Sequence, residues 1–238
     1  LDGSKAVGID KVTKDEYGKN LDRNIKDLVQ RLKNKSFKPL PSLRVYIPKA
    51  NGKKRPLGIA SYEDKIVQMA VKKILGAIYE PRFLNCMYGF RSNRGCHEAI
   101  KEVYQRISYG KISYIVDADI KGFFDHIDHE WMMKFLEWNI RDKNLLWLIR
   151  KYLKAGIMEQ GKFEPTEEGS AQGSVMSPML ANIYMHHVLT LWFKLVVKKE
   201  MQGECFLVNF ADDFVAGFQY KSEAERYYKE LKERMEKF

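Results

Sequence analysis

Residues 205–218 read Cys205-Phe-Leu-Val-Asn-Phe-Ala-Asp-Asp-Phe-Val-Ala-Gly-Phe218, and this stretch decides the fold. Two apolar runs, 205–210 and 214–218, flank an Ala-Asp-Asp turn, which predicts a hairpin with two carboxylates at its tip. Aspartate is also an ordinary turn residue, so one such turn does not by itself indicate a site. A second strand that ends in carboxylates would make a functional site the better interpretation.

The apolar run 112–118 is such a strand, because Asp117 and Asp119 lie at its end. Alternation along a strand puts both on one face, so spacing alone does not choose between them. Carboxylates brought together repel one another unless a cation lies between them, and hard oxygen ligands suit Mg²⁺. Two ions about 3.5–4 Å apart can hold the attacking and leaving oxygens of phosphoryl transfer. Together with the basic residues Lys49, Lys53, Lys54 and Arg55, the two strand ends predict an enzyme that acts on nucleotide phosphates.

The rest of the chain alternates helices with hairpins. Hydrophobic periodicity predicts helices at about 21–35, 62–79, 96–108, 129–138, 143–155, 178–199 and 223–237. A second hairpin, 43–47 with 57–60, is expected to turn at Asn51-Gly52. Ser61 and Asp142 are the expected N-caps, and Ser222-Glu-Ala-Glu225 is the expected capping box of the last helix. Hairpins mixed with helices predict an α+β fold with an antiparallel sheet packed on helices.

Composition indicates a folded chain with one strongly basic region. The 238 residues are 45% hydrophobic and carry 41 Lys+Arg against 31 Asp+Glu, a formal charge of +10. From Arg31 to Arg55 nine basic residues occur without an acidic one. Such a block attracts polyanions and favours a nucleic acid, the alternative being a solvated basic face. No amphipathic anchor accompanies it, and the apolar run 178–197 carries polar residues, so a buried helix is favoured over a membrane span.

Cysteine and histidine patterns give no competing chemistry. The three cysteines are far apart, which excludes a disulfide scaffold and indicates a reduced, intracellular compartment. His126 and His129 have helix-face spacing, but no third zinc ligand stands near them in the sequence. His186 and His187 lie on an apolar helix and are interpreted as core histidines.

Five segments occur in an order that carries more information than any one of them. They are Ile47-Pro-Lys-Ala-Asn-Gly-Lys-Lys-Arg-Pro-Leu-Gly-Ile59, Tyr88-Gly-Phe-Arg-Ser-Asn-Arg-Gly-Cys-His-Glu-Ala-Ile100, Asp119-Ile-Lys-Gly-Phe-Phe-Asp-His-Ile-Asp-His129, Ala171-Gln-Gly-Ser-Val-Met-Ser-Pro-Met-Leu-Ala-Asn182 and Phe210-Ala-Asp-Asp213. Together they resemble the fingers and palm of a reverse transcriptase, most closely the group II intron-encoded (maturase) kind. One departure is Phe210, where that kind more often has Tyr; Phe keeps the apolar ring and loses only the hydroxyl.

The resemblance implies a right-hand polymerase core. Fingers are expected at 1–95 and 127–176, with part of the N-terminal lid region, and palm at 96–126 and 177–238. The family's thumb, maturase and any endonuclease domain are expected to be absent from this chain, which leaves open its activity as a separate piece. Loss of a thumb would expose apolar surface, so a homodimer is a further expectation.

The implied activity is that of an RNA-directed DNA polymerase, a nucleotidyltransferase. It would extend a DNA primer with dNTPs on an RNA template, use two Mg²⁺ ions, and bind intron RNA to aid splicing and mobility. Two alternatives stay open: a protein that is mainly an RNA-binding splicing cofactor, and a reverse transcriptase of the retron or diversity-generating type. The expected location is cytoplasmic and associated with nucleic acid, with no membrane partner.

Site residues follow from the motifs that match. Asp119, Asp212 and Asp213 would be catalytic and would hold the metal ions with the main-chain carbonyl of Ile120; the family's Asp-Ile-Lys pattern selects Asp119 over Asp117. The residues that would bind the dNTP are Lys49, Arg55, Phe124 and Gln172. The residues that would bind RNA are Lys53, Lys54, Arg91 and Arg94.

Phe124 has a specific implied role. It would be the gate whose ring excludes a ribose 2′-OH, whereas its neighbour Phe123 is expected to be a core residue. The alternative for Phe124 is a packed aromatic, and the alternative for the basic residues is a solvated surface.

Overall fold

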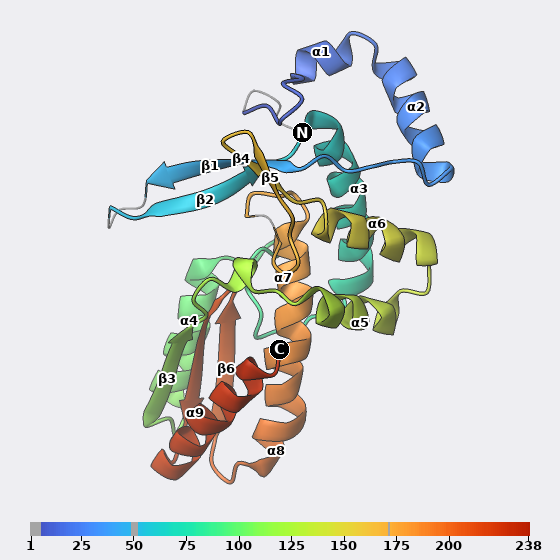
Figure 1. The fold of residues 1–238 in the computed structure, drawn as a ribbon. Coiled ribbons are helices and arrows are strands. Elements are labelled where there is room, and N and C mark those ends of the chain that lie inside the picture. Colours follow the sequence, from blue (N-terminus) through green and yellow to red (C-terminus); the bar gives the residue numbers. More distant parts are fainter. Residues whose placement is uncertain (1–5, 49–51, 171) are drawn as a thin grey trace. The chain divides into compact units, whose positions relative to one another are not determined.

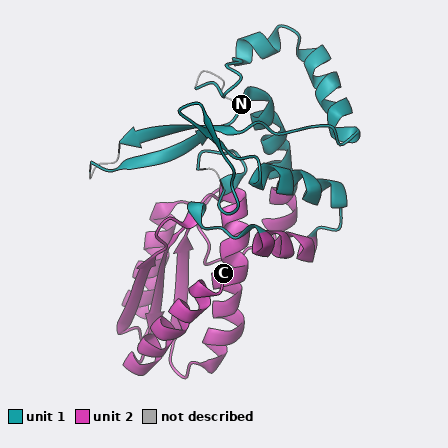
Figure 2. Ribbon diagram, viewed as in Figure 1, with its two compact units in different colours: residues 1–74, 124–129, 140–177 teal, residues 75–123, 130–139, 178–238 magenta. Residues whose placement is uncertain are grey.

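The computed structural model describes residues 6–48, 52–170 and 172–238. These residues form two compact units (Figure 2). Unit 1 comprises 1–74, 124–129 and 140–177, and unit 2 comprises 75–123, 130–139 and 178–238. The fingers and palm boundaries stay a prediction, because the units are a division by compactness alone.

Unit 1 is built around a four-stranded sheet in the order β2-β1-β4-β5 (Figure 1). β1 (Ser42–Pro48) and β2 (Lys54–Ile59) form the predicted basic hairpin, and β4 (Ile157–Glu159) and β5 (Lys162–Glu164) form a second, short one. β1 pairs with β4 in parallel, so the sheet joins segments more than 100 positions apart in sequence. Its helices are α1 (Lys14–Gly18), α2 (Leu21–Lys33), α6 (Lys143–Leu153) and the first turns of α3 (Tyr62–Tyr79).

Unit 2 is built around an antiparallel sheet in the order β3-β7-β6. Its strands are β3 (Tyr114–Asp119), β6 (Cys205–Phe210) and β7 (Asp213–Phe218). Its helices are the end of α3, α4 (Cys96–Tyr109), most of α5 (His129–Asn139), α7 (Ser177–Met185), α8 (Lys198–Glu200) and α9 (Lys221–Glu236). A short 3-10 turn, Phe123–Asp125, follows β3. These elements confirm the predicted α+β class.

The two faces of the β3-β7-β6 sheet are covered unequally. On one face Phe218 packs against the rings of Phe193 and Tyr227, which brings α9 and the long apolar helix onto the sheet. On the other face α4 packs over β6, where Ala99 joins a cluster with Phe206 and Val208. Along a strand side chains alternate, so the residues of β3 on this second face are Ile115, Asp117 and Asp119, and all three are exposed. The carboxylates therefore lie on the open part of a sheet that is otherwise covered.

The long apolar helix is continuous from Ser177 to Glu200 and contains two π-helical turns, His186–Thr190 and Phe193–Val197. Within the described residues it is the one helix long and apolar enough to cross a membrane, and 72% of its most apolar window is buried inside the structure. It thus packs as a core helix, as the sequence predicts. The π turns were not predicted, because hydrophobic periodicity does not resolve a one-residue change in winding.

The first residues of the helices show which of the predicted capping motifs form in the structure. Ser61 Oγ accepts from the Asp64 N–H at 3.0 Å, and Asp142 Oδ1 accepts from the N–H groups of Asn144 and Leu145, so both predicted N-caps are confirmed. The capping box predicted at 222–225 is wrong. α9 begins at Lys221, and the Glu223 carboxylate instead accepts from the backbone N–H groups of Gln202 and Gly203. The helix therefore starts one residue before Ser222, and the two residues that the motif pairs, Ser222 and Glu225, both lie inside it.

His186 generates a pH prediction for unit 2. It is only 5% exposed, its Nδ1 lies 3.2 Å from Thr190 Oγ1, and burial lowers its pKa to about 4. Because the folded state favours the neutral ring, the stabilisation is complete above the unfolded pKa, near 6.5, and is lost as pH falls toward 4. We expect His186→Gln to remove roughly 2–3 kcal/mol of the acid-induced loss of unfolding free energy between pH 7 and 4. Chemical denaturation of the unmodified and variant proteins between pH 7 and 4 measures this difference. If the unfolding free energy falls equally with pH in both proteins, the assignment to His186 is contradicted.

Candidate active site

The three predicted catalytic carboxylates come together at one end of the β3-β7-β6 sheet. Asp119 is the last residue of β3 and Asp213 the first residue of β7, and the two are direct partners in the antiparallel register. Partners of this kind have Cα atoms about 4.5–5.5 Å apart. The Ile120 N–H donates to the Asp212 carbonyl oxygen at 3.3 Å, which extends the pairing one residue beyond the ladder. The sheet thus joins both carboxylate-bearing strand ends.

The carboxylates at this strand end affect one another electrostatically. Burial raises the pKa of Asp213, and the charges of Asp212, Asp119 and Asp117 raise it further, in that order. Four acidic groups therefore share one field, and ionising all of them is unfavourable without a cation. Asp117 contributes least among them, which agrees with its position two residues before the strand end.

The donor set fits a hard divalent cation. Within the described residues, no three His, Cys, Asp or Glu side chains already form a closed metal-binding group. Mg²⁺ does not need one, because it usually binds through one or two carboxylates and completes its octahedron with water and substrate phosphates. Exposed carboxylates that repel one another at a strand end are the protein half of such a site.

The turn that carries the paired aspartates is held by close packing. Ala211 has φ of 58°, a left-handed conformation that is uncommon for a residue with a side chain. Gly89 lies directly against it: a Cβ on Gly89 would meet the Ala211 backbone nitrogen at 2.4 Å. Asn182 Nδ2 donates to the Gly89 carbonyl at 2.8 Å. The second sequence block and the Ala171–Asn182 motif therefore both support the turn from within unit 2.

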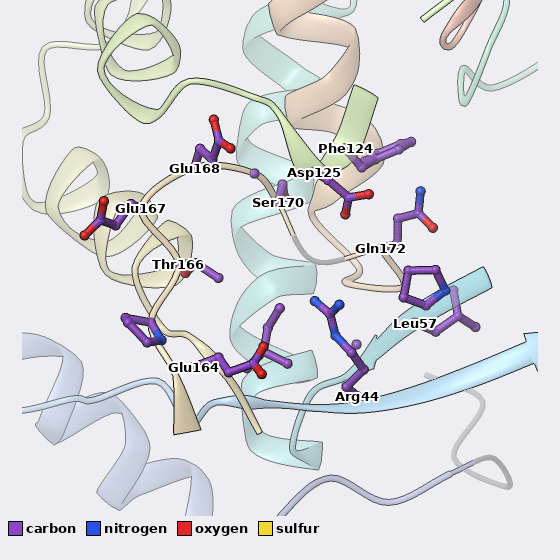
Figure 3. A pocket seen from close by; sticks show the side chains of 15 residues that line it. Arg44, Leu57, Phe124, Asp125, Glu164, Thr166, Glu167, Glu168, Ser170 and Gln172 are labelled. Carbon is purple, nitrogen blue, oxygen red and sulfur yellow. The ribbon is translucent and has the colours of Figure 1, made fainter. Parts of the chain in front are cut away.

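Two of the predicted dNTP-binding residues line one cavity of unit 1. Its volume is about 290 Å³, and Phe124, Gln172 and Leu57 form part of its wall (Figure 3). Phe124 is 9% exposed, and Gln172 Oε1 is buried with no hydrogen-bond partner in the described part of the chain. The wall also carries four acidic residues and one arginine, namely Asp125, Glu164, Glu167, Glu168 and Arg44.

The loop that carries Gln172 is fixed from two sides. The Gly58 N–H of β2 donates to the Gln172 carbonyl oxygen, so the loop is tied to the basic hairpin. Gln68, a buried residue of α3, accepts at its Oε1 from Ser174 Oγ and from the Val175 N–H, both at 3.1 Å. The sequence motifs gave no role to Gln68, and its position in the structure gives it one.

The predicted phosphate-binding and RNA-binding residues have different surroundings. Lys53, Lys54 and Arg55 are exposed on the β1–β2 hairpin, with Arg55 opposite Ile47 in the register. Lys49, also predicted to bind the triphosphate, lies outside the described residues. The described part of the hairpin therefore carries three exposed cations in succession.

Arg91 and Arg94 hold the loop after α3. The Arg91 side chain is only 6% exposed, its Nε pairs with Glu80 at 2.8 Å, and its Nη1 donates to the carbonyls of Leu84 and Met87. This geometry speaks against the phosphate contact that the sequence suggested for Arg91, because the guanidinium is already buried and bonded. Arg94 is half-buried and donates to the backbone and side chain of Asn85.

Comparison with known proteins now decides the family. The family described as "Reverse transcriptase (RNA-dependent DNA polymerase)" matches residues 47–238, which include all five ordered segments. The chain belongs to the reverse transcriptase family. Its sequence relatives include a group II intron-encoded protein and an intron maturase, which confirms the resemblance seen in the sequence. As a nucleotide polymerase family, reverse transcriptases depend on metal and bind an RNA template.

The relatives are longer than this reverse transcriptase chain. It is 40% identical over 202 residues to the group II intron-encoded protein LtrA of Lactococcus lactis subsp. cremoris, covering 84% of this chain and 33% of LtrA. It is 37% identical over 187 residues to protein YkfC of Escherichia coli, covering 77% of this chain and 49% of YkfC. The chain therefore spans a third to a half of the length of these relatives.

A solved structure supports the fold. The telomerase of Candida albicans, in complex with a fragment of telomeric RNA, superposes with a TM-score of 0.62 at 14% identity. The match covers 91% of this chain and 44% of the telomerase chain. At that identity the likeness concerns the fold alone, and it confirms the reverse transcriptase fold that the motifs predicted.

Gly89 generates a prediction about the aspartate turn. Gly89→Ala places a methyl group against the rigid backbone of Ala211, so either the turn or the 86–89 segment must shift. We expect a loss of about 1–3 kcal/mol in unfolding free energy, measured by chemical denaturation. Gly76→Ala is the matched control, because a Cβ there meets only the flexible Met179 side chain at an ordinary 3.6 Å. Equal stability of the two variants would show that the turn adapts freely.

Proposed function

We propose that this chain carries the catalytic core of a group II intron-encoded RNA-directed DNA polymerase. The observation that supports it most is the direct pairing of Asp119 with Asp213 at an open sheet end, beside Asp212. A module that only binds RNA has no need for three positioned carboxylates. The reaction is the attack of a primer 3′-OH on the α-phosphorus of a dNTP, with pyrophosphate leaving.

In this proposal each residue has a defined task. Asp119, Asp212 and Asp213 hold two Mg²⁺ ions together with the Ile120 carbonyl; when bound, these ions activate the 3′-OH and neutralise the leaving pyrophosphate. Lys49 and Arg55 bind the triphosphate, for which a planar guanidinium is well shaped. Gln172 lies along the nucleotide, and the Phe124 ring excludes a 2′-OH. Much of the rate then comes from positioning and electrostatic stabilisation.

The proposed partners are an RNA template, a DNA primer, dNTPs and the intron RNA, whose splicing the protein would aid. Relatives named as intron maturases support that second task. An intracellular, nucleic-acid-associated location is part of the same proposal. A protein that is mainly a splicing cofactor, a retron or diversity-generating enzyme and a homodimer stay as alternatives or expectations from the sequence.

Primer extension on an RNA template tests the function in the longer natural protein that contains this chain. We expect Asp119→Asn and Asp212→Asn each to lower the extension rate at least about 100-fold, because each removes a metal ligand. Asp117→Asn is the matched control on the same strand face, and its loss should be far smaller. Extension that survives Asp119→Asn, or that fails equally in Asp117→Asn, would refute the assignment.

The hairpin tip generates a prediction about RNA affinity. Charge reversal at Lys53 and Lys54 removes cations next to the phosphate backbone, so RNA binding weakens and depends less on salt. Each lost phosphate contact should reduce the slope of log K against log salt by about 0.7–0.9. Fluorescence anisotropy at several salt concentrations measures this. Charge reversal at Lys229 and Lys232 on α9 gives the same net charge, and an identical effect there would show that only net charge matters.

Phe124 generates a prediction about sugar selection. Phe124→Ala opens space at the wall of the unit 1 cavity, so incorporation of rNTPs should rise relative to dNTPs by about 10–200-fold, measured as a ratio of kcat/KM values. Phe123 packs against the Tyr184 ring at 6.2 Å in unit 2, so Phe123→Ala should instead cost about 3–5 kcal/mol of stability. An active Phe124→Ala protein with unchanged selectivity would remove the gate assignment.

A further inference from the structure

The turn between β6 and β7 requires a specific restraint. It places Asp212 and Asp213 one after the other directly behind Ala211, whose φ of 58° is left-handed. A residue with a Cβ enters this region at a cost, which only surrounding contacts can offset. Packing against Gly89 accounts for one side of the turn. A buried side chain of β6 contacts the turn as well.

That side chain is Asn209, which is 1% exposed. Its Nδ2 donates to the Ala211 carbonyl oxygen at 2.8 Å and to the Asp213 carbonyl oxygen at 3.3 Å. Both partners are carbonyl acceptors, so the NH₂ end of the amide must face them. One side chain therefore holds the peptide group before Asp212 and the peptide group after Asp213.

The backbone of Asn209 is fixed independently of the turn. Its N–H donates to the Cys86 carbonyl and its carbonyl accepts from the Tyr88 N–H, both at 2.8 Å, while it pairs with Phe214 of β7 on its other side. A side chain that starts from such an anchored position restrains the turn rather than following it. Through Asn209, the position of the aspartate turn is fixed relative to the sheet.

The amide oxygen of Asn209 indicates that this side chain is not present to stabilise the core. Asn209 Oδ1 is buried and has no hydrogen-bond partner among the residues that the structure describes. An unpaired buried carbonyl destabilises the folded state, and an apolar residue of the same size would not have it. Leucine would therefore satisfy the packing at this position, whereas only an amide reaches both turn carbonyls.

We propose that Asn209 is a positioning residue, which holds Asp212 and Asp213 in their metal-binding geometry by restraining the left-handed turn at Ala211. The inference rests on the proposed function, because it takes the paired aspartates as metal ligands. It assigns to Asn209 a role in ligand geometry that is separable from its role in folding.

Mn²⁺ titration of the chain, followed by the electron paramagnetic resonance signal of free Mn²⁺, tests the proposal without an activity assay. Asn209→Leu should raise the dissociation constant for Mn²⁺ about 10-fold, as expected for loss of a group that orients a metal ligand. The same variant should change the melting temperature little, because loss of the unpaired Oδ1 offsets loss of the two hydrogen bonds to the turn carbonyls. Metal affinity and stability then change independently.

Two further variants serve as controls. Thr190→Val removes another buried polar group of unit 2, whose Oγ1 donates to the His186 carbonyl far from the turn in sequence. It should lower the melting temperature and leave Mn²⁺ affinity unchanged. Asp212→Asn should abolish the tight Mn²⁺ site; if it does not, the proposed metal site itself is wrong.

A rescue experiment completes the test. Glycine adopts the left-handed conformation readily, so Ala211→Gly should restore part of the Mn²⁺ affinity lost in Asn209→Leu. In the unmodified chain the turn is already formed, and Ala211→Gly should change affinity little. Asp212-dependent Mn²⁺ binding that is the same in Asn209→Leu, or equal gains from Ala211→Gly in both backgrounds, would overturn the positioning role while leaving the metal site intact.

Discussion

The antiparallel pairing of β3 with β7 is the constraint on which the candidate site depends. It aligns Asp119 with Asp213 as the last pair of a six-residue ladder. A shift of the register by one residue would move every side chain of β3 to the opposite face and place the Asp119 carboxylate among the buried apolar groups. The apolar partners further along the ladder, such as Ala118 with Phe214 and Val116 with Ala216, make that shift unfavourable. Burial of the rest of the sheet thus fixes the position of the carboxylates.

The same sheet leaves its acidic end exposed to solvent, and this exposure is what allows several carboxylates to lie close together. α4 covers the face at β6, whereas Asp117 and Asp119 on β3 stay exposed. Exposure limits the electrostatic cost of several nearby carboxylates, because water screens their repulsion. Burial and the remaining repulsion raise the pKa of Asp213, which marks a place where a divalent cation lowers the energy.

In unit 1 the candidate site depends on a polar loop, the one that carries Gln172, which is fixed by buried hydrogen bonds. Gln68 accepts two hydrogen bonds from the loop that carries Gln172, and β2 binds the same loop through its backbone. The Phe124 segment is tied in as well, because the Ser170 N–H donates to the Phe124 carbonyl at 2.7 Å. The cavity wall in Figure 3 is therefore made of segments distant in sequence that share backbone hydrogen bonds.

Much of the fold and several site residues of this protein could be predicted from its sequence alone. Alternation and periodicity gave the two hairpins and the main helices, and the ordered motifs gave the family and singled out Asp119, because these signals are local or stored in residue identity. Other features depended on contacts between distant segments. α9 begins at Lys221 and its Glu223 is bonded to 202–203, and Arg91 is buried and paired with Glu80. The roles of Gly89 and Asn209 arose in the same way.

Choosing between Asp117 and Asp119 shows the difference most clearly. Spacing placed both on one strand face, and only the motif separated them before the fold was known. In the structure the register separates them physically, since Asp119 faces Asp213 whereas Asp117 faces Val215. Sequence patterns determine which face a residue occupies, because that depends on the local backbone. Which residue lies across from it is decided by tertiary pairing, because that depends on where a strand nearly 100 positions away comes to rest.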